Sequence, residues 1–210
     1  MRGVVDMNEL NDRGDQAKSD LRRRQVLDAA TECFRREGFH GSSIARISRA
    51  AGMSAGHIYH YFANKEAIVE AIADREQDNM ADLVQKLAQD TEGGDLVARL
   101  TRHTAEKVEQ NSDPAVVGLM LELAAESARN PTIAQILQRS DRVIGDQFVD
   151  LIHCMGSLSN LPTEELRLRM TMIAALMQGL AMRSIVEPER DQDATVRLLN
   201  KVVTALLEDE

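Results

Sequence analysis

Hydrophobic residues recur at intervals of three and four along most of this chain, which is the pattern of amphipathic helices. An apolar stripe that begins at Val26 predicts a first helix over about 19–37, which Gly38 ends. Residues 1–18 are polar and lack such a stripe, so we expect a disordered tail there. Capping residues such as Asn64, and Pro114 and Pro131 in first turns, predict further helices, about nine in total, with breaks at 91–94 and 156–162. The predicted ranges are 43–50, 55–61, 64–89, 95–110, 113–129, 131–155, 163–186 and 191–207.

The last two helices are apolar on more than one side. Few positions between Met170 and Val186 interrupt a run of apolar residues, and a helix of that kind must be covered on several sides. We therefore expect the segments 163–187 and 191–207 to face the core on one side and a second copy of the chain on the other. The alternative is that both are central core helices.

The segment Ser42 to Phe62 contains two short helical patterns separated by a tight turn. Gly52 lies in the turn, and Ser54 caps the second helix. Two short helices joined by a turn with a glycine are typical of a helix-turn-helix, whose second helix enters the major groove of DNA. The alternative is an ordinary helical hairpin.

The distribution of charge favours DNA binding by this segment, although the whole chain has a net charge of −9. Residues 19–65 carry eight Lys or Arg and four acidic residues, which gives +4, whereas residues 66–210 carry −12. A basic module on an acidic body fits local binding of DNA phosphates.

Five residues of this segment have chemistry that suits DNA. Ser43, at a helix start, can direct backbone N–H groups and its hydroxyl toward a phosphate, and Arg46 on the outer side can reach a phosphate or a guanine edge. Ala55 and Gly56 are small enough for close approach of the backbone, and His57 can donate a hydrogen bond to a base or a phosphate.

Residues 22–72 resemble the N-terminal domain of the TetR/AcrR family of bacterial repressors. The resemblance implies that Tyr59 and His60 contact bases or the DNA backbone, and that Lys65 binds another phosphate. It covers about a quarter of the chain, and a weaker similarity extends to residues 122–131. The residues that carry it are 26–30, Phe34, 38–39, 43–44, Ile47, 50–54, Gly56, 58–62 and 64–66.

The resemblance also implies the domain organisation and the function. We expect an all-α protein with a three-helix DNA-binding domain over 19–66 and an effector-binding and dimerisation domain over 67–210. The expected function is a homodimeric transcriptional repressor on a palindromic operator, released by a small, mostly apolar effector. An activator, or a regulator without a ligand, is the alternative.

The composition of the body constrains the effector. Phe148 is the sole aromatic residue after position 65, so an aromatic cage for a cation is not expected. Methionines can line an adaptable apolar cavity, although they also fill ordinary cores, and Glu122 can equally be a solvated or paired surface carboxylate. The candidate effector-binding residues are Met120, Glu122, Phe148, Met177 and Gln178.

Other classes of protein lack support in the sequence. We find no nucleophile–base pair, carboxylate pair or phosphate-binding glycine loop, so neither an enzyme nor a cofactor is expected. His57 and His60 have no further ligand to complete a metal site. No long apolar run or signal peptide is visible, and Cys33 and Cys154 are expected to be buried, reduced thiols of a cytoplasmic protein.

Overall fold

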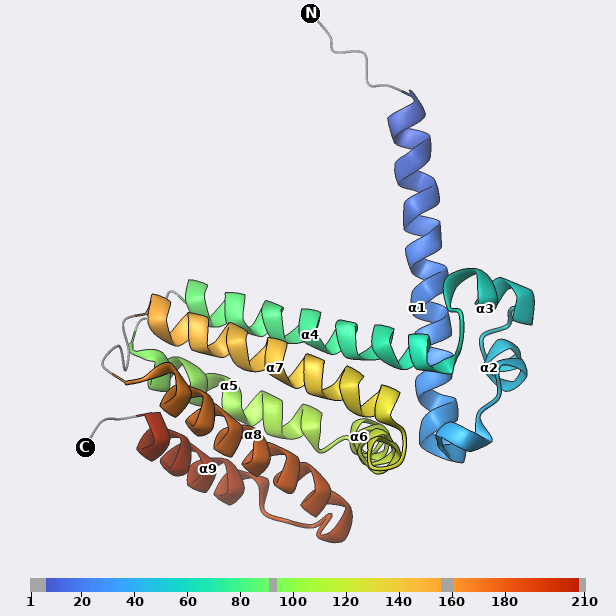
Figure 1. Ribbon diagram of the computed structural model, residues 1–210. Helices are drawn as coiled ribbons and strands as arrows, with labels where there is room; N and C mark the ends of the chain where they lie inside the picture. Colours follow the sequence, from blue (N-terminus) through green and yellow to red (C-terminus); the bar gives the residue numbers. More distant parts are fainter. Residues whose placement is uncertain (1–6, 91–93, 156–160, 208–210) are drawn as a thin grey trace, which may run out of the picture. The chain divides into compact units, whose positions relative to one another are not determined.

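The computed structural model describes residues 7–90, 94–155 and 161–207, with the backbone alone for residues 7–15. The described residues form nine α-helices, which confirms the predicted all-α fold (Figure 1). They divide into two compact units, residues 1–72 and 73–210, and the division falls inside the fourth helix. The helices are α1 Met7–Gly41, α2 Ile44–Ala50, α3 Ala55–Tyr61, α4 Lys65–Gln89, α5 Leu96–Asn111, α6 Pro114–Ser127, α7 Pro131–Cys154, α8 Thr163–Val186 and α9 Gln192–Leu207.

Helix α1 differs from its predicted bounds at the start. It begins at Met7, and thus includes residues that the sequence pattern assigned to a tail. A polar stretch without proline can continue a helix whose later turns are packed, and the Gln16 amide donates to Asp20 one turn on, at 3.1 Å. The predicted stop is confirmed, because Gly38 has φ 73° and ψ 168° and breaks the helical path.

The first unit packs α1 against α2, and α2 against α3, around a small buried core. Phe34 and Phe39 lie on either side of the Gly38 kink, with ring centroids 5.5 Å apart. Phe62 also belongs to this core and is 3% exposed. The other fully buried side chains of this core are Val26, Ala30, Ile47, Ile58, Ile68 and Val69.

The second unit has longer helices that bury apolar faces in two clusters. The first joins Leu87 of α4 to Leu151 of α7 and Leu166 of α8. The second joins Val108 of α5 to Leu199 and Val203 of α9, where α5 and α9 pack closely. Helix α8 contributes to both clusters, so its inner side is covered as the sequence predicted.

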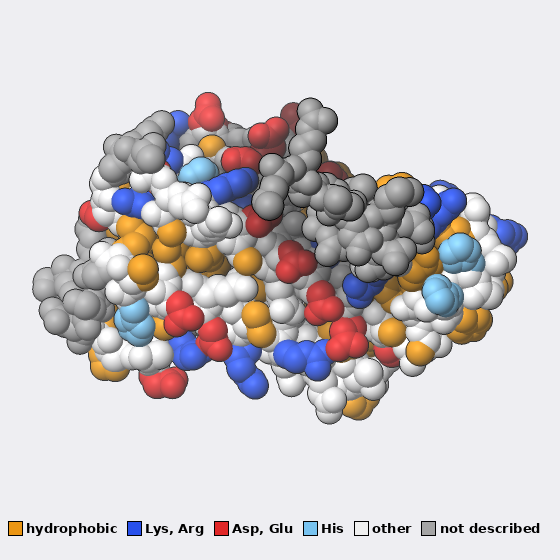
Figure 2. Space-filling view, turned by 90° about the horizontal axis from the view of Figure 1, so that it is seen from above, with side chains coloured by type: hydrophobic (Ala, Val, Ile, Leu, Met, Phe, Trp, Pro, Cys, Tyr) orange, Lys and Arg blue, Asp and Glu red, His pale blue; other side chains and the backbone are white. Residues whose placement is uncertain are grey.

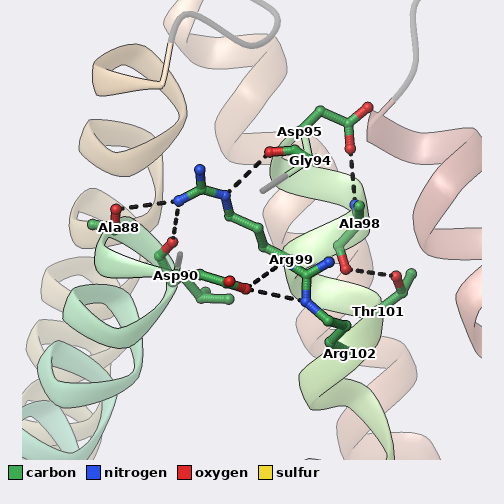
Figure 3. Close-up of polar contacts among 9 residues, drawn as sticks. Ala88, Asp90, Gly94, Asp95, Ala98, Arg99, Thr101 and Arg102 are labelled. Atoms are coloured by element: carbon green, nitrogen blue, oxygen red, sulfur yellow. Dashed lines mark hydrogen bonds and ion pairs between the residues drawn. The ribbon is translucent and has the colours of Figure 1, made fainter. Parts of the chain in front are cut away.

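Arginines of α5 hold the C-terminal end of α4 in place (Figure 3). The Arg99 guanidinium donates to the Leu87 and Ala88 carbonyls at 2.8 and 3.2 Å, which satisfies carbonyls that the last turn of a helix leaves unpaired. Arg102 forms an ion pair with Asp90 just beyond the helix. The predicted breaks at 91–94 and 156–162 fall largely on residues 91–93 and 156–160, which lie outside the described residues.

Candidate nucleic-acid interface

The α2–turn–α3 segment is built from two capped helices. The Ser43 hydroxyl accepts a hydrogen bond from the Arg46 amide, and the Ser54 hydroxyl accepts one from the His57 amide, both at 3.2 Å. Such caps fix the first turn of a helix that is too short to be stable alone. Gly52 has φ 63°, which only glycine adopts readily, so the turn conforms to the predicted helix-turn-helix.

A side chain of α1 fixes the turn from outside the motif. The Gln25 amide donates to the Ala51 carbonyl at 2.7 Å. Because these residues are 26 positions apart, the sequence offered no signal for the contact. Nearby, the Arg23 guanidinium lies 5.5 Å from the centre of the Phe62 ring. Both contacts hold the motif against α1.

Helix α3 presents polar and aromatic groups on its outer side. Gly56, His57, Tyr59 and His60 are exposed, and the exposed fraction of Tyr59 is 57%. The His57 ring stacks on the Tyr61 ring with centroids 5.4 Å apart, which restricts the orientation of its imidazole. A side chain at Gly56 would meet no protein atom within 4 Å, so packing inside the chain does not require glycine there. Histidine, basic and hydrophobic side chains lie together on this part of the surface (Figure 2).

Lys65 lies in the first turn of α4 and has contacts that the sequence did not indicate. Its ammonium donates to the Phe39 carbonyl at 2.6 Å and lies 4.2 Å from the centre of the Phe39 ring. It therefore joins the start of α4 to the corner that follows Gly38. The predicted cap of α4 is present, because the Asn64 side chain accepts from the Ala67 amide at 2.8 Å.

Arg46 is the basic side chain of α2 that forms an ion pair across the unit. Its guanidinium pairs with the Glu37 carboxylate at the end of the regular part of α1. The two side chains are 52% and 29% exposed, so the pair lies at the surface. Burial, followed by the charge of Glu37, raises the pKa of the neighbouring Cys33 thiol.

The body contains a polar groove between α4 and α5, with a volume of about 370 Å³. None of the five predicted effector-binding residues lines it. Phe148 packs on the cluster around Leu87, Met177 packs on the cluster around Val108, and Gln178 is exposed. Met120 and Glu122 are half-buried on α6. The residues that line the groove are Glu76, Asn79, Asp82, Leu83, Lys86, His103, Glu106, Lys107, Gln110, Asn111 and Val116.

Models of known protein families match residues in both units. The profile described as "Bacterial regulatory proteins, tetR family" matches residues 26–72, which include the whole α2–turn–α3 segment. The profile described as "BetI-type transcriptional repressor, C-terminal" matches residues 97–208, more than half of the chain. The chain belongs to the TetR family. It is a DNA-binding transcriptional regulator with a BetI-type C-terminal domain, and not an enzyme.

Similarity to individual proteins extends over most of the chain. The regulator BetI of Escherichia coli UMN026 is 30% identical over an alignment of 168 residues, which covers 78% of this chain and 82% of BetI. The structure of Salmonella enterica GusR is 29% identical, has a TM-score of 0.73, and is matched over 89% of this chain and 95% of GusR. A complex of SmeT with triclosan shares the fold at 22% identity, with a TM-score of 0.70 over 90% and 93% of the two chains.

None of the described helices combines the length and the hydrophobicity that are needed to cross a bilayer.

Proposed function

We propose that this TetR-family protein is a homodimeric repressor that binds a palindromic operator and is released by a small molecule. The apolar outer side of α8 supports the dimer most directly. Leu168, Met172 and Leu176, at four-residue spacing, are 53%, 48% and 38% exposed. Met182 and Val186 continue the same stripe and are 48% and 64% exposed.

Helix α9 adds Leu198 and Val202, which are 62% and 42% exposed. An exposed apolar surface of this extent on two adjacent helices is typical of an interface. A twofold dimer through α8 and α9 would carry two α3 helices, and these enter successive major grooves when they are about 34–36 Å apart.

The proposed DNA contacts are those of the helix-turn-helix. Ser43 and Arg46 bind phosphates, and Ser54, Ala55, Gly56 and His57 form the first turn that meets base edges. The open space around Gly56 supports a role in close approach, because no internal packing accounts for a residue without a side chain. Tyr59, His60 and Lys65 are proposed to contact the flanking backbone.

The operator contact is tested with His57→Ala in the full chain. Because the His57 side chain is exposed, we expect unchanged folding and an affinity for the operator about 10- to 100-fold weaker, the usual range for a lost base contact. His153→Ala, at an exposed position of the body, is the matched control and should bind as the wild type does. Equal affinity and salt dependence of the two variants would contradict the assignment of His57.

The effector is proposed to bind in the body, and two places suit different chemistry. The two apolar clusters on which Phe148 and Met177 pack offer side chains that suit the mostly apolar molecule that the sequence predicted. The groove between α4 and α5 has charged and amide walls and suits a polar one. SmeT in complex with triclosan is a protein of this fold that holds a small molecule, which supports an effector in general.

Repression and its release need separate tests. Deleting the gene should raise expression from a reporter that carries the operator, whereas reduced expression would favour an activator. Native mass spectrometry of the purified protein identifies a co-purified small molecule, and its addition should weaken operator binding. Operator binding that no such molecule changes would favour a regulator without a ligand.

A further inference from the structure

The ion pair between Arg46 and Glu37 joins a proposed DNA contact to a carboxylate of the same unit. Glu37 belongs to the last turn before the Gly38 kink, and Arg46 to the first turns of α2. In the free protein, the guanidinium that is expected to bind a phosphate is thus already paired with an anion.

Glu32, a second carboxylate of α1, has a different set of pairing partners. Glu32 accepts hydrogen bonds from Arg35 at 2.6–3.0 Å and lies 3.9 Å from Arg36, so both of its partners belong to α1 itself. The hydrogen bond from Arg35 lowers the pKa of Glu32. Glu37, in contrast, reaches from α1 to the helix-turn-helix.

We infer that Glu37 is an intramolecular competitor of DNA for Arg46. The inference rests on the proposed contact between Arg46 and a phosphate. When DNA binds, Arg46 exchanges its ion pair with Glu37 for one with a phosphate. The cost of breaking the pair with Glu37 offsets part of the favourable free energy of the new contact. Glu37 therefore lowers the affinity for any duplex, because phosphate contacts are independent of sequence.

The expected effect is modest, since both side chains of the pair are partly exposed to water. Exposed ion pairs contribute little to stability, so removing the competitor should tighten DNA binding about two- to fivefold at low salt. The gain should shrink as salt is raised, because salt screens an exposed pair.

The experiment measures binding of the full chain to a fluorescent DNA duplex of random sequence. The duplex has about 30 base pairs, which span three turns of DNA. Binding is measured over a series of salt concentrations. Glu37→Gln removes the carboxylate and nearly preserves its shape. Glu32→Gln, on the same helix, removes the same charge without touching Arg46 and is the matched control. Circular dichroism confirms that each variant is folded, and Glu37→Ala provides a second removal of the carboxylate.

A double-mutant cycle with Arg46→Ala separates competition from simple repulsion between Glu37 and the DNA. Competition requires Arg46, so Glu37→Gln should tighten binding in the wild-type background and have no more effect than Glu32→Gln in the Arg46→Ala background. Repulsion would persist unchanged in both backgrounds, and that result would overturn the inference.

Failure of the inference and failure of the proposed contact give different results. If Arg46→Ala weakens binding while Glu37→Gln behaves like Glu32→Gln, the phosphate contact stands and the competition is refuted. If Arg46→Ala leaves binding unchanged, the proposed contact of Arg46 fails, and the inference fails with it.

Discussion

The DNA-binding unit and the body differ in what holds their helices in place. Helices α2 and α3 have seven residues each, too short to persist without support. Serine caps fix their first turns, and the buried side chains of Ile47 and Ile58 anchor them in a small core. Hydrogen bonds from Gln25 to the Ala51 carbonyl and from Lys65 to the Phe39 carbonyl fix the turn and the corner before α2. Specific polar contacts thus supplement a small apolar core in the unit that must match the shape of DNA.

The body relies on burial of apolar surface by long helices. Helices α4, α7 and α8 have 24 or 25 residues, and their inner faces meet in extended apolar clusters. The outer side of α8 remains apolar and exposed. The exposed surface of α3 mixes polar and aromatic side chains, whereas the body has an exposed apolar surface that is suited to a partner.

The largest effect is expected from charges on the proposed dimer surface. Met172→Glu combined with Val202→Glu places carboxylates on α8 and α9 where both wild-type side chains are exposed, so folding of the monomer is preserved. Light scattering should show a monomer. Because the two DNA-binding units are then no longer linked, affinity for a palindromic operator should fall at least about 100-fold.

The control for this prediction is Val116→Glu, on α6. Its wild-type side chain is 49% exposed, much like those at the proposed interface, but lies outside α8 and α9. This variant should remain dimeric and bind DNA normally. If the double variant also stays dimeric, the apolar surface of α8 and α9 is not the interface.

The next effect is expected at Lys65. Lys65→Met removes the hydrogen bond to the Phe39 carbonyl and the contact of the ammonium with its ring, and should lower the free energy of unfolding by about 1–3 kcal/mol. Loss of a phosphate contact should also reduce the salt slope of DNA binding by about one unit. Urea denaturation and salt titration measure the two effects separately.

Lys86→Met on the same helix is the matched control, because Lys86 is exposed and lies in the body. Its free energy of unfolding should stay within about 0.5 kcal/mol of the wild type. A Lys65→Met variant with a reduced salt slope and wild-type stability would show that Lys65 acts on DNA alone, as the sequence suggested.

The bounds of the helices were largely predictable, because residues at or next to each helix end signal where it begins or stops. Ser43, Ser54 and Asn64 cap helices as expected, and Pro114 and Pro131 occupy first turns. The start of α1 was misplaced, since a polar helical extension has no apolar stripe to reveal it.

The contacts between elements were not predictable in the same way. The hydrogen bond from Gln25 and the ion pair of Glu37 depend on the angle between α1 and α2, which no local pattern encodes. Phe148 and Met177 were both predicted to bind an effector, but no pattern in the sequence indicated that they pack on different clusters. The polar groove was missed because most residues of its α4 and α5 walls have charged or amide side chains that, taken singly, are typical of solvated surface.

A smaller effect is expected when the turn loses its link to α1. Gln25→Ala removes the hydrogen bond to the Ala51 carbonyl and should destabilise the first unit by about 1 kcal/mol. Hydrogen exchange at the Gly52 and Met53 amides should become faster, with little change in the body. Gln16→Ala, which removes an exposed contact on the same helix, should leave both amides unchanged.

The smallest expected effect is a difference in the rate at which a reagent labels the thiol of each unit. Cys33 is buried as expected, with 8% exposed, and burial followed by the charge of Glu37 raises its pKa. Cys154 is exposed, so the expectation of two buried thiols is wrong for this residue. Because the thiolate is the reactive form, a disulfide reagent at pH about 8 should label Cys154 rapidly and Cys33 only when the first unit opens.

The variants Cys154→Ser and Cys33→Ser assign the two phases of labelling. Combining Cys154→Ser with Lys65→Met should accelerate labelling of Cys33, because Lys65 stabilises the unit that buries this thiol. Combining it with Lys86→Met should not. Equal acceleration by both lysine variants would contradict a specific role of Lys65 in the stability of the unit that buries Cys33.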